Sequence, residues 1–294
     1  MPVVLLGLGS NLGNRQAILE DAVSKIGHSL DVLSVSAWFT YPAVGGPTGQ
    51  QDFLNGALVG RTELAPHDLV QQLQRIERDA GRERIRRWDS RTLDCDLLLY
   101  GDQTIDTESL QVPHPRMITR RFVLEPAASV APDMVHPHIG WTMKRLLGHL
   151  EDATPYYCVL GPNEAQTLEI AQQISKSTGF PLVTRAQLPG ENSKSPIAWT
   201  SVTSELLHDL DASSGLISTF WFWEPWLEDD RLAVPVEFSS ALAPKLIIVT
   251  EPTGSAFAQK FAKLQPSLRR PTLFLSAKQD DALQDAIGCV QAMQ

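Results

Sequence analysis

Residues 1–152 are predicted to form an α+β sandwich of the ferredoxin-like kind, and residues 156–294 a smaller α/β domain with a parallel sheet. Three observations lead to this prediction. A chain of 294 residues with 43% hydrophobic content can build two ordinary cores. Apolar runs and helical spacings in the first half follow the order βαββαβ. In the second half, short apolar strands alternate with helical runs, which is typical of parallel sheets.

The first domain is expected to open with a strand, a turn and a helix. Val3–Leu8 is apolar, GSNLGN supplies turn residues, and an apolar helical stripe then runs over 18–26 until Gly27 closes the helix. The spacing GxGxxxG, with no acidic residue after a second strand, argues against a dinucleotide site. The three glycines are instead interpreted as a tight strand-to-helix turn; they are Gly7, Gly9 and Gly13.

The remaining elements are expected to complete one antiparallel sheet. Strands are predicted over Val32–Phe39 and Phe53–Arg61, separated by a Pro/Gly segment. Pro66 begins a helix whose apolar stripe ends near Gly81. The strand LDCDLLLY, residues 93–100, closes the order. The sheet is expected to carry its helices on one face.

The second domain is expected to begin with the strand Tyr156–Leu160, the loop GPNEAQT and a helix. Further buried strands are predicted at KLIIVTEP (245–252) and PTLFLSA (271–277), with helical runs between them and from Asp280 onward. The aromatic segment FWFWEPW (220–226) is either a core strand or an exposed interaction patch.

Composition and charge argue against several classes of protein. The 25 Lys and Arg against 34 Asp and Glu give a net charge of -9, which disfavours a general nucleic-acid binder. No stretch approaches the ~18 apolar residues of a membrane span, and the first residues lack the pattern of a signal peptide, so a cytoplasmic protein is expected. The spacing of Cys95, Cys158 and Cys289 favours neither a disulfide framework nor a zinc site.

Asp94 and Asp96 are two residues apart on a predicted strand, so their carboxylates leave the same face about 6.6 Å apart. Cys95 and Leu97 are expected on the other face. This spacing suits divalent cations held between carboxylates and phosphate oxygens, and magnesium is the natural choice. Alone, the pattern also fits a partly exposed strand edge. The adjoining leucines argue against a plain strand edge, because carboxylates among apolar residues would be costly without a cation or an arginine partner.

An arginine-rich stretch lies directly upstream of this pair. Seven arginines and no lysine occur from Arg75 to Arg91, and guanidinium groups suit bidentate contact with phosphate oxygens. Beside paired carboxylates they can neutralise a triphosphate, whereas alone the stretch also fits a solvated loop. In VPHPR, His114 lies in a loop stiffened by prolines, where it is either a phosphate ligand or a structural residue.

Taken together, these segments resemble the 6-hydroxymethyl-7,8-dihydropterin pyrophosphokinase family, ATP-dependent enzymes of folate synthesis. The resemblance rests on GLGSNLGNR, DFLNGA, LQRIE, RWDSRTLDCDLLLYG and VPHPRMITRRFVLEPAASVAPDMVHP, in this order over residues 7–137. The string RWDSRTLDCDLLLYG followed by VPHPRM is far more specific than any of its parts. The family implies a ferredoxin-like α+β sandwich, in agreement with the order of elements predicted above.

The resemblance implies roles for the residues at matching positions. Asp94 and Asp96 correspond to the magnesium-binding pair, with two ions expected, and Arg82 and Arg91 to arginines that act on the triphosphate. The implied ATP contacts are Gln74, Glu77, Arg84, Trp88, Leu97, His114 and Arg120. The implied pterin site is lined by Pro42, Val44, Phe53, Asn55 and Phe122. The two phenylalanines would stack on the pterin ring, and the asparagine would hydrogen-bond its polar edge.

The implied reaction is the transfer of a diphosphate group. The hydroxymethyl oxygen of the pterin attacks the β-phosphorus of ATP, and AMP leaves. Positioning and cation placement are expected to contribute more than a general base, and the arginine-rich stretch is expected to close over ATP. Tyr41, Ala43 and Pro115 depart from the bacterial pattern, which affects details of the pterin-side and adenine-side loops. The alternative is a pterin- or ATP-binding pseudoenzyme, or an assembly protein governed by the second domain.

The second domain has no place in the minimal family. Its strand, loop and helix resemble the phosphate loop of deoxynucleoside-kinase-like proteins, but a working loop needs GxxxxGK[ST]. Here Gly161 is followed by PNEAQT, in which a glutamate would repel a phosphate. Three roles stay open: a degenerate kinase-like domain used for structure, homodimer contacts or regulation; a binding module for a small ligand or partner; and an active second enzyme.

Overall fold

The computed structural model describes residues 1–44, 49–82, 90–107, 109–153, 155–184, 215–219, 244–252, 254–261, 270–275 and 279–293. The chain divides into two compact units, Met1–Leu147 and Gly148–Gln294. The roles predicted for residues 1–152 and 156–294 stay predictions. The aromatic segment 220–226 lies outside the described residues.

The first unit is of α+β type and is built on an antiparallel sheet in the order β2-β4-β1-β5, with β3 paired to β4. Its strands are β1 Val3–Ser10, β2 Asp31–Val35, β3 Phe39–Tyr41, β4 Phe53–Arg61 and β5 Asp94–Tyr100. Helix α1 (Arg15–Ile26) follows β1, and α2 (Pro66–Asp79) lies between β4 and β5. Apart from the division of one predicted strand into two, this is the predicted βαββαβ order.

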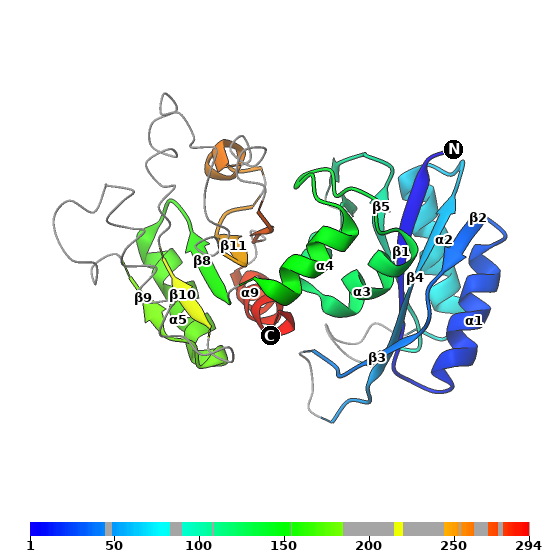
Figure 1. Ribbon diagram of the computed structural model, residues 1–294, viewed down its shortest axis with the longest axis horizontal. Coiled ribbons are helices and arrows are strands. Elements are labelled where there is room, and N and C mark those ends of the chain that lie inside the picture. Colours follow the sequence, from blue (N-terminus) through cyan, green and yellow to red (C-terminus); the bar gives the residue numbers. More distant parts are fainter. Residues whose placement is uncertain are drawn as a thin grey trace. The chain divides into compact units, whose positions relative to one another are not determined.

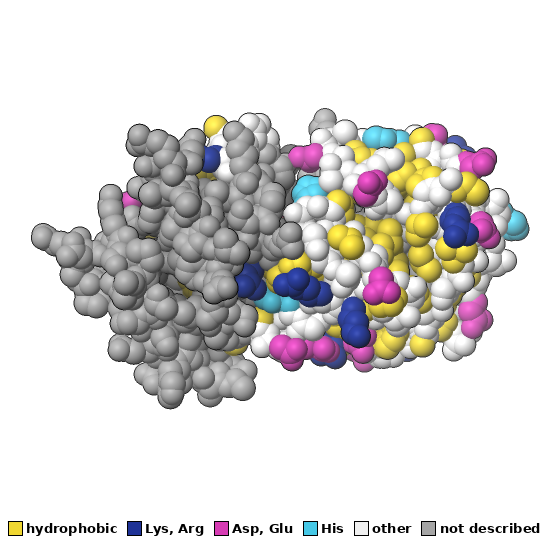
Figure 2. Space-filling model, turned by 45° about the horizontal axis from the view of Figure 1, so that its top comes forward, with side chains coloured by type: hydrophobic (Ala, Val, Ile, Leu, Met, Phe, Trp, Pro, Cys, Tyr) yellow, Lys and Arg dark blue, Asp and Glu magenta, His cyan; other side chains and the backbone are white. Residues whose placement is uncertain are grey.

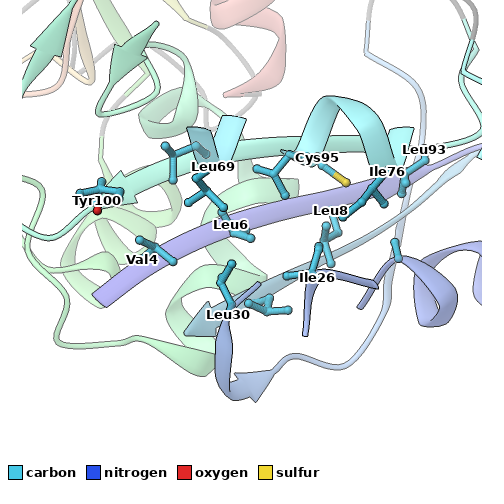
Figure 3. Close-up of a cluster of buried hydrophobic side chains, with 14 of the residues drawn as sticks. Val4, Leu6, Leu8, Ile26, Leu30, Leu69, Ile76, Leu93, Cys95 and Tyr100 are labelled. Atoms are coloured by element: carbon cyan, nitrogen blue, oxygen red, sulfur yellow. The ribbon is translucent and has the colours of Figure 1, made fainter. Parts of the chain in front are cut away.

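Helices α1 and α2 form their core against one face of this sheet. Leu69, Leu73 and Ile76 are buried at helical spacing on α2, and Leu6 and Leu8 meet them from alternate positions of β1. Figure 3 shows side chains from β1, β5 and the helices converging in this cluster. Cys95 and Leu97 of β5 belong to it as well. Because side chains alternate along a strand, Asp94 and Asp96 lie on the opposite face, as predicted.

A third helix corrects the prediction that all helices lie on one face. After the 3-10 turn Met117–Thr119, helix α3 (Arg121–Val130) packs against β4, β1 and β3. Figure 1 shows α3 on the side of the sheet away from α1 and α2. The resemblance placed residues 112–137 in the first domain, but no helix was predicted there, and the face that α3 covers depends on tertiary contacts.

The strand predicted over 32–39 is two strands, which is a second correction. Between β2 and β3, the Ser36 hydroxyl accepts a hydrogen bond from Ala57 N at 2.9 Å, and Ser36 N donates to Ala57 O. The Trp38 ring lies directly over Gly56, where a Cβ atom would collide with it. The regular pairing with β4 is interrupted between Val35 and Phe39, where the side chains of Ser36 and Trp38 contact β4 instead.

The interpretation of the first glycines was wrong for two of them. Gly7 and Gly9 lie inside β1, and only Gly13, at φ 66°, forms the turn before α1. At the end of that turn, the Asn14 side chain accepts from Ala17 N and caps the helix. Two predicted helix ends are confirmed, since Gly27 is the C-cap of α1 and Gly81 follows α2 at φ 79°.

The rest of the first unit contains a short hairpin and a further helix. The hairpin pairs β6 (Ile105–Asp106) with β7 (Gln111–Val112). Helix α4 (Met143–Asp152) begins in the first unit and ends in the second. Figure 2 shows Lys and Arg interspersed with Asp and Glu among the described residues of the visible face. Within the described part of the chain, no helix combines the length and apolar content that a membrane crossing needs.

The second unit contains a parallel sheet, as predicted. Its strands are β8 Tyr156–Leu160, β9 Leu182–Val183, β10 Leu216–Ser218, β11 Leu246–Val249 and β12 Thr272–Phe274, in the order β12-β11-β8-β10-β9. Helix α5 (Glu164–Thr178) follows β8, with Asn163 as its N-cap, and α9 spans Gln279–Ala292. The strands at 156–160, 246–249 and 272–274 confirm the three strands predicted from the sequence; β8 and β11 are buried throughout, whereas in β12 only Leu273 is buried.

Candidate active site

A row of three residues crosses the sheet on the face opposite α1 and α2. In the strand register Gly9 of β1 is paired with Asn55 of β4 on one side and with Asp94 of β5 on the other. A Cβ atom on Gly9 would lie 2.9 Å from Asn55 Oδ1 and 3.9 Å from the Cβ of Asp94. Gly9 therefore leaves open the space between an amide on one strand and a carboxylate on another.

Two arginines hold the Asp94 carboxylate. Arg82 Nη1 lies 2.8 Å from Asp94 Oδ1, and Arg91 Nη1 lies 2.8 Å from Oδ2. Arg82 lies shortly after the end of α2, and Arg91 lies just before the start of β5. The two ends of the segment that connects α2 to β5 therefore both contact the Asp94 carboxylate. Burial alone would raise the pKa of Asp94, but the two guanidinium groups outweigh it and hold the pKa below its usual value.

Glu77 fixes this arrangement from within the core. It is 3% exposed, it contacts the Arg82 guanidinium, and its Oε1 accepts a hydrogen bond from Cys95 N at 2.8 Å. Arg82 N also donates to the Glu77 carbonyl at 3.0 Å. One buried carboxylate on α2 therefore connects this helix with Arg82 and with the backbone of Cys95, between Asp94 and Asp96.

Asp96 is the next residue of β5 on the same face as Asp94, and it is paired with Gly7 of β1. Its electrostatic environment differs from that of Asp94. Burial and the charge of Asp94 raise its pKa to about 6, although Arg120 and Arg116 act in the other direction. The arginines thus favour the charged form of Asp94, whose charge in turn disfavours the charged form of Asp96. The pair suits a divalent cation because such an ion would remove this repulsion.

His114 lies next to Asp96, with Nε2 4.0 Å from Asp96 Oδ2. Burial, together with the positive charges of Arg120 and Arg116, lowers its pKa to about 3, so the imidazole is neutral at neutral pH. Its Nδ1 accepts from Arg116 N at 3.2 Å, which places the proton on Nε2. His114 therefore offers a neutral N–H donor toward the carboxylate side of the site.

Magnesium fits these donors. Among the described residues, no group of three or more His, Cys, Asp and Glu gathers as a metal site. Magnesium is usually held by one or two carboxylates together with phosphate oxygens and water, rather than by a complete protein cage. Asp94 and Asp96, whose side chains are 24% and 35% exposed, have the chemistry and the access for this kind of binding.

The other end of the row carries the residues predicted to bind pterin. Asn55 is 6% exposed, and its buried Nδ2 has no hydrogen-bond partner among the described residues. Phe53 Cδ1 lies 3.8 Å from the Cβ position of Gly9, on the same face. Phe122 lies in the first turn of α3, where the Arg120 guanidinium is 5.4 Å from its ring centroid. A buried amide without a partner is costly, so Asn55 is suited to a ligand with a polar edge.

The remaining predicted residues are less closely joined to this centre. Pro42 is exposed and Val44 is half-buried after β3, while Gln74 is half-buried on α2, one turn before Glu77. The Leu97 side chain is 5% exposed in the core on the other face. Arg84 and Trp88 lie outside the described residues. Their roles in ATP or pterin binding stay predictions.

Sequence reasoning missed the part played by Asn11, which is completely buried. Its Nδ2 donates to Gln51 O and to Ser90 Oγ, both at 3.2 Å, and its Oδ1 accepts from Arg91 N at 2.7 Å. Asn11 thus connects the end of the pterin-side segment with the end of the arginine-rich stretch. The letters SNLG indicate a turn, but contacts over 40 and 80 residues leave no local signal.

One end of the row has carboxylates, arginines and a neutral imidazole, and the other end has a buried amide and aromatic rings. These groups define a phosphate-transferring enzyme with an organic acceptor. Residues 5–132 match the family model described as 7,8-dihydro-6-hydroxymethylpterin-pyrophosphokinase. The match lies within the first unit.

Curated relatives agree with this match. The chain is 38% identical over 149 residues to the 2-amino-4-hydroxy-6-hydroxymethyldihydropteridine pyrophosphokinase of Synechocystis sp., covering 50% of this chain and 75% of that protein. It is 33% identical over 160 residues to the enzyme of the same name from Aquifex aeolicus, covering 54% of this chain and 99% of that protein. The chain belongs to the hydroxymethyldihydropterin pyrophosphokinase family. It is an ATP-dependent diphosphokinase that transfers diphosphate to 6-hydroxymethyl-7,8-dihydropterin in folate biosynthesis.

Solved structures show a more distant likeness. A Plasmodium falciparum HPPK-DHPS structure aligns over 93% of this chain and 81% of that chain, at 12% identity and a TM-score of 0.40. Such a likeness is too low to bear on the role of either unit.

Proposed function

We propose that the row Asn55–Gly9–Asp94 is the catalytic centre of diphosphate transfer, with the pterin at the Asn55 end and the phosphates of ATP at the Asp94 end. The observation that carries this proposal is the strand register, which places the amide and the carboxylate on either side of one glycine. Paired residues on antiparallel strands lie about 5 Å apart, so the row spans about 10 Å. A pterin alcohol and a β-phosphorus can meet over that distance.

At the ATP end, Asp94 and Asp96 hold magnesium, with two ions expected. The cations supply charge neutralisation and orientation of the phosphates. Arg82 and Arg91 are positioned to stabilise charge on the transferred group, because both already contact a carboxylate oxygen in the space that phosphate oxygens would share. His114 donates its Nε2 proton to a phosphate oxygen, and Arg120 adds positive charge beside Asp96. Gln74, Glu77, Arg84 and Trp88 complete the proposed nucleotide side, whereas Leu97, whose side chain lies in the core on the other face, is proposed to contribute through its backbone.

At the pterin end, Asn55 Nδ2 supplies the hydrogen bond to the polar edge of the ring. Phe53 and Phe122 supply the flat apolar surfaces, and Pro42 and Val44 line the segment after β3. The arrangement aims the hydroxymethyl oxygen along β1, over Gly9, toward the phosphates. Holding two substrates in this way converts a bimolecular reaction into an effectively unimolecular one.

Pterin binding tests the assignment of the two ends. The dissociation constant of the pterin would be measured by its fluorescence, with magnesium and a non-hydrolysable ATP analogue present. Asn55→Ala is expected to weaken pterin binding about 10-fold or more, because a buried hydrogen bond is lost. ATP-analogue binding should be unchanged. An Asn55→Ala protein that binds pterin as the wild type does would overturn the placement of the pterin.

For the second unit we propose a degenerate P-loop-kinase-like domain that serves in assembly. Gly161 lies at the carboxyl end of the central strand β8, next to the N-terminus of α5. A Cβ atom on Gly161 would collide with Thr250 Oγ1 and lie 2.8 Å from Thr167 Oγ1, so side chains fill the space beside this glycine. With Glu164 in the first turn of α5, the loop is poorly suited to bind a phosphate.

Homodimer formation through this second unit is the role tested first. Light scattering would compare the full chain with a fragment ending at residue 152, and a full-length dimer that becomes a monomer would support assembly. A monomeric full chain at micromolar concentration would contradict it.

The expected location is the cytoplasm, where ATP and pterin are present together, and fluorescence microscopy of a tagged chain would check it.

A further inference from the structure

Tyr41 is the last residue of β3 and is adjacent to both phenylalanines of the proposed pterin site. Its Cα is paired with that of Phe53 across the antiparallel strands β3 and β4. Its ring centroid lies 6.2 Å from that of Phe122, with the planes at 56°. Residues paired across strands share a face of the sheet, so Tyr41 and Phe53 both lie on the face that α3 covers.

The hydroxyl of Tyr41 is anchored on α3. It donates a hydrogen bond to Glu125 Oε2, and Arg121 Nε donates to the same oxygen at 3.1 Å. The bond from Tyr41 is the main cause that lowers the pKa of Glu125, while burial and the same bond raise the pKa of Tyr41. At neutral pH the hydroxyl therefore keeps its proton and the carboxylate keeps its charge, which gives a charge-assisted bond.

This contact joins β3 to the part of α3 that faces the site. Phe122 and Glu125 are three residues apart on α3, so they lie on neighbouring positions of one helix face. The residue before the helix, Arg120, lies over the Phe122 ring and contributes to the electrostatics of Asp96. Fixing Glu125 against Tyr41 therefore also fixes the first turn of α3, from which both ends of the site receive a side chain.

We propose that Tyr41 is a positioning residue for the pterin: through its bond to Glu125 it holds Phe122 at the stacking position and sets the start of the Pro42–Val44 segment. The proposal rests on the proposed pterin site. Tyr41 does not enter the reaction. Loss of its hydroxyl leaves the ring and its packing in place but releases Phe122, which weakens pterin binding more than it slows the chemical step.

The test compares Tyr41→Phe, Glu125→Gln and the double variant in the full chain. Each single variant is expected to raise the KM for pterin about 3- to 10-fold, with kcat within about 2-fold and the KM for ATP unchanged. The double variant is expected to be no worse than the single variants, because the hydroxyl and the carboxylate act as one unit. Additive effects in the double variant would contradict the proposed bond.

Tyr100→Phe is the matched control. The Tyr100 hydroxyl also donates a hydrogen bond, to Leu64 O at 2.7 Å, but Tyr100 belongs to the core on the other face. This control is expected to lower the melting temperature and leave the KM for pterin unchanged. If Tyr41→Phe behaves in the same way, Tyr41 is a structural residue and the proposal is overturned.

Asn55→Ala separates this proposal from the proposed pterin site. If Asn55→Ala weakens pterin binding and Tyr41→Phe does not, the site stands and the positioning role falls. If neither variant weakens pterin binding, both fall together. The proposal is supported when both variants weaken pterin binding in the wild-type background. In a Glu125→Gln background, Asn55→Ala should still weaken it, whereas Tyr41→Phe should have no further effect.

Discussion

The guanidinium of Arg82 lies 2.8 Å from the Asp94 carboxylate and also contacts the buried carboxylate of Glu77. The side chains of Arg82 and Glu77 are only 12% and 4% exposed, so little water reaches this contact. Asp94 and Glu77 outweigh the effect of burial and raise the pKa of Arg82, which stays charged. One arginine therefore links the core of the first unit to the carboxylate proposed to bind magnesium.

The buried link predicts a stability effect at Glu77. Glu77→Gln keeps an acceptor for Cys95 N but removes the charge opposite Arg82, so we expect the free energy of unfolding to fall by about 1–3 kcal/mol. Urea denaturation measures it. Asp21→Asn, which breaks the exposed Lys25–Asp21 pair on α1, should leave the transition midpoint unchanged. If the two substitutions lower the free energy of unfolding equally, the buried contact contributes no more to stability than an exposed ion pair.

The raised pKa of Asp96 predicts a pH-dependent response to magnesium. The folded protein holds this proton more tightly than the unfolded chain, with a pKa of about 6 against the ordinary 3.8. The resulting stability is fully present below the ordinary value and is lost as pH rises through about 6. The lowered pKa of Asp94 acts at lower pH, where its contribution is lost as pH falls below the ordinary value.

Magnesium needs the ionised carboxylates, so its stabilising effect should grow as the pH rises. We expect the magnesium-induced rise in melting temperature to be larger at about pH 7.5 than at about pH 5. Differential scanning fluorimetry at fixed ionic strength measures it. Asp96→Asn should remove most of this difference. The same rise at both pH values in the wild type would show that protonation of Asp96 does not compete with the metal.

Gly9 predicts a steric effect on the pterin end of the site. In Gly9→Ala the added methyl would lie 2.9 Å from Asn55 Oδ1, so the amide must move, and the KM for pterin should rise about 10-fold. Gly7→Ala is the matched control on the same face of β1, because its methyl meets only Leu98 at the ordinary distance of 3.5 Å. Steady-state kinetics decide the matter: a Gly7→Ala protein with the larger pterin defect would contradict the assigned geometry.

The alternation of Asp94, Cys95, Asp96 and Leu97 shows what the sequence can predict. Period-two alternation predicted which face each side chain occupies, and helical spacing predicted α1 and α2, because these are properties of neighbouring residues. The resemblance then named residues of the site, including Arg82 and Asn55. Of these, the structure brings Arg82, Arg91, Glu77 and His114 around the two aspartates, and places Asn55 across Gly9.

Other features depend on contacts that no local pattern records. The Trp38 ring over Gly56 divides one predicted strand into two, and the cover of the second face by α3 follows from long-range packing. Gly7 and Gly9 were assigned to the turn because the turn segment SNLGN follows them directly, although β1 continues through both. Asn11 gave no signal, and Tyr41 was noted only as a departure from the bacterial pattern, since their partners lie 40 to 84 residues away.

The central claim is that Asp94 and Asp96 hold the metal for diphosphate transfer, and pterin-dependent release of AMP tests it most directly. Purified protein would be mixed with ATP, magnesium and 6-hydroxymethyl-7,8-dihydropterin, and AMP would be quantified for the wild type, Asp94→Asn and Asp96→Asn. Circular dichroism would confirm that each variant is folded. We expect AMP from the wild type only when pterin is present, and a loss of about 100-fold or more in each variant. Wild-type rates of AMP release from either folded variant would contradict the claim.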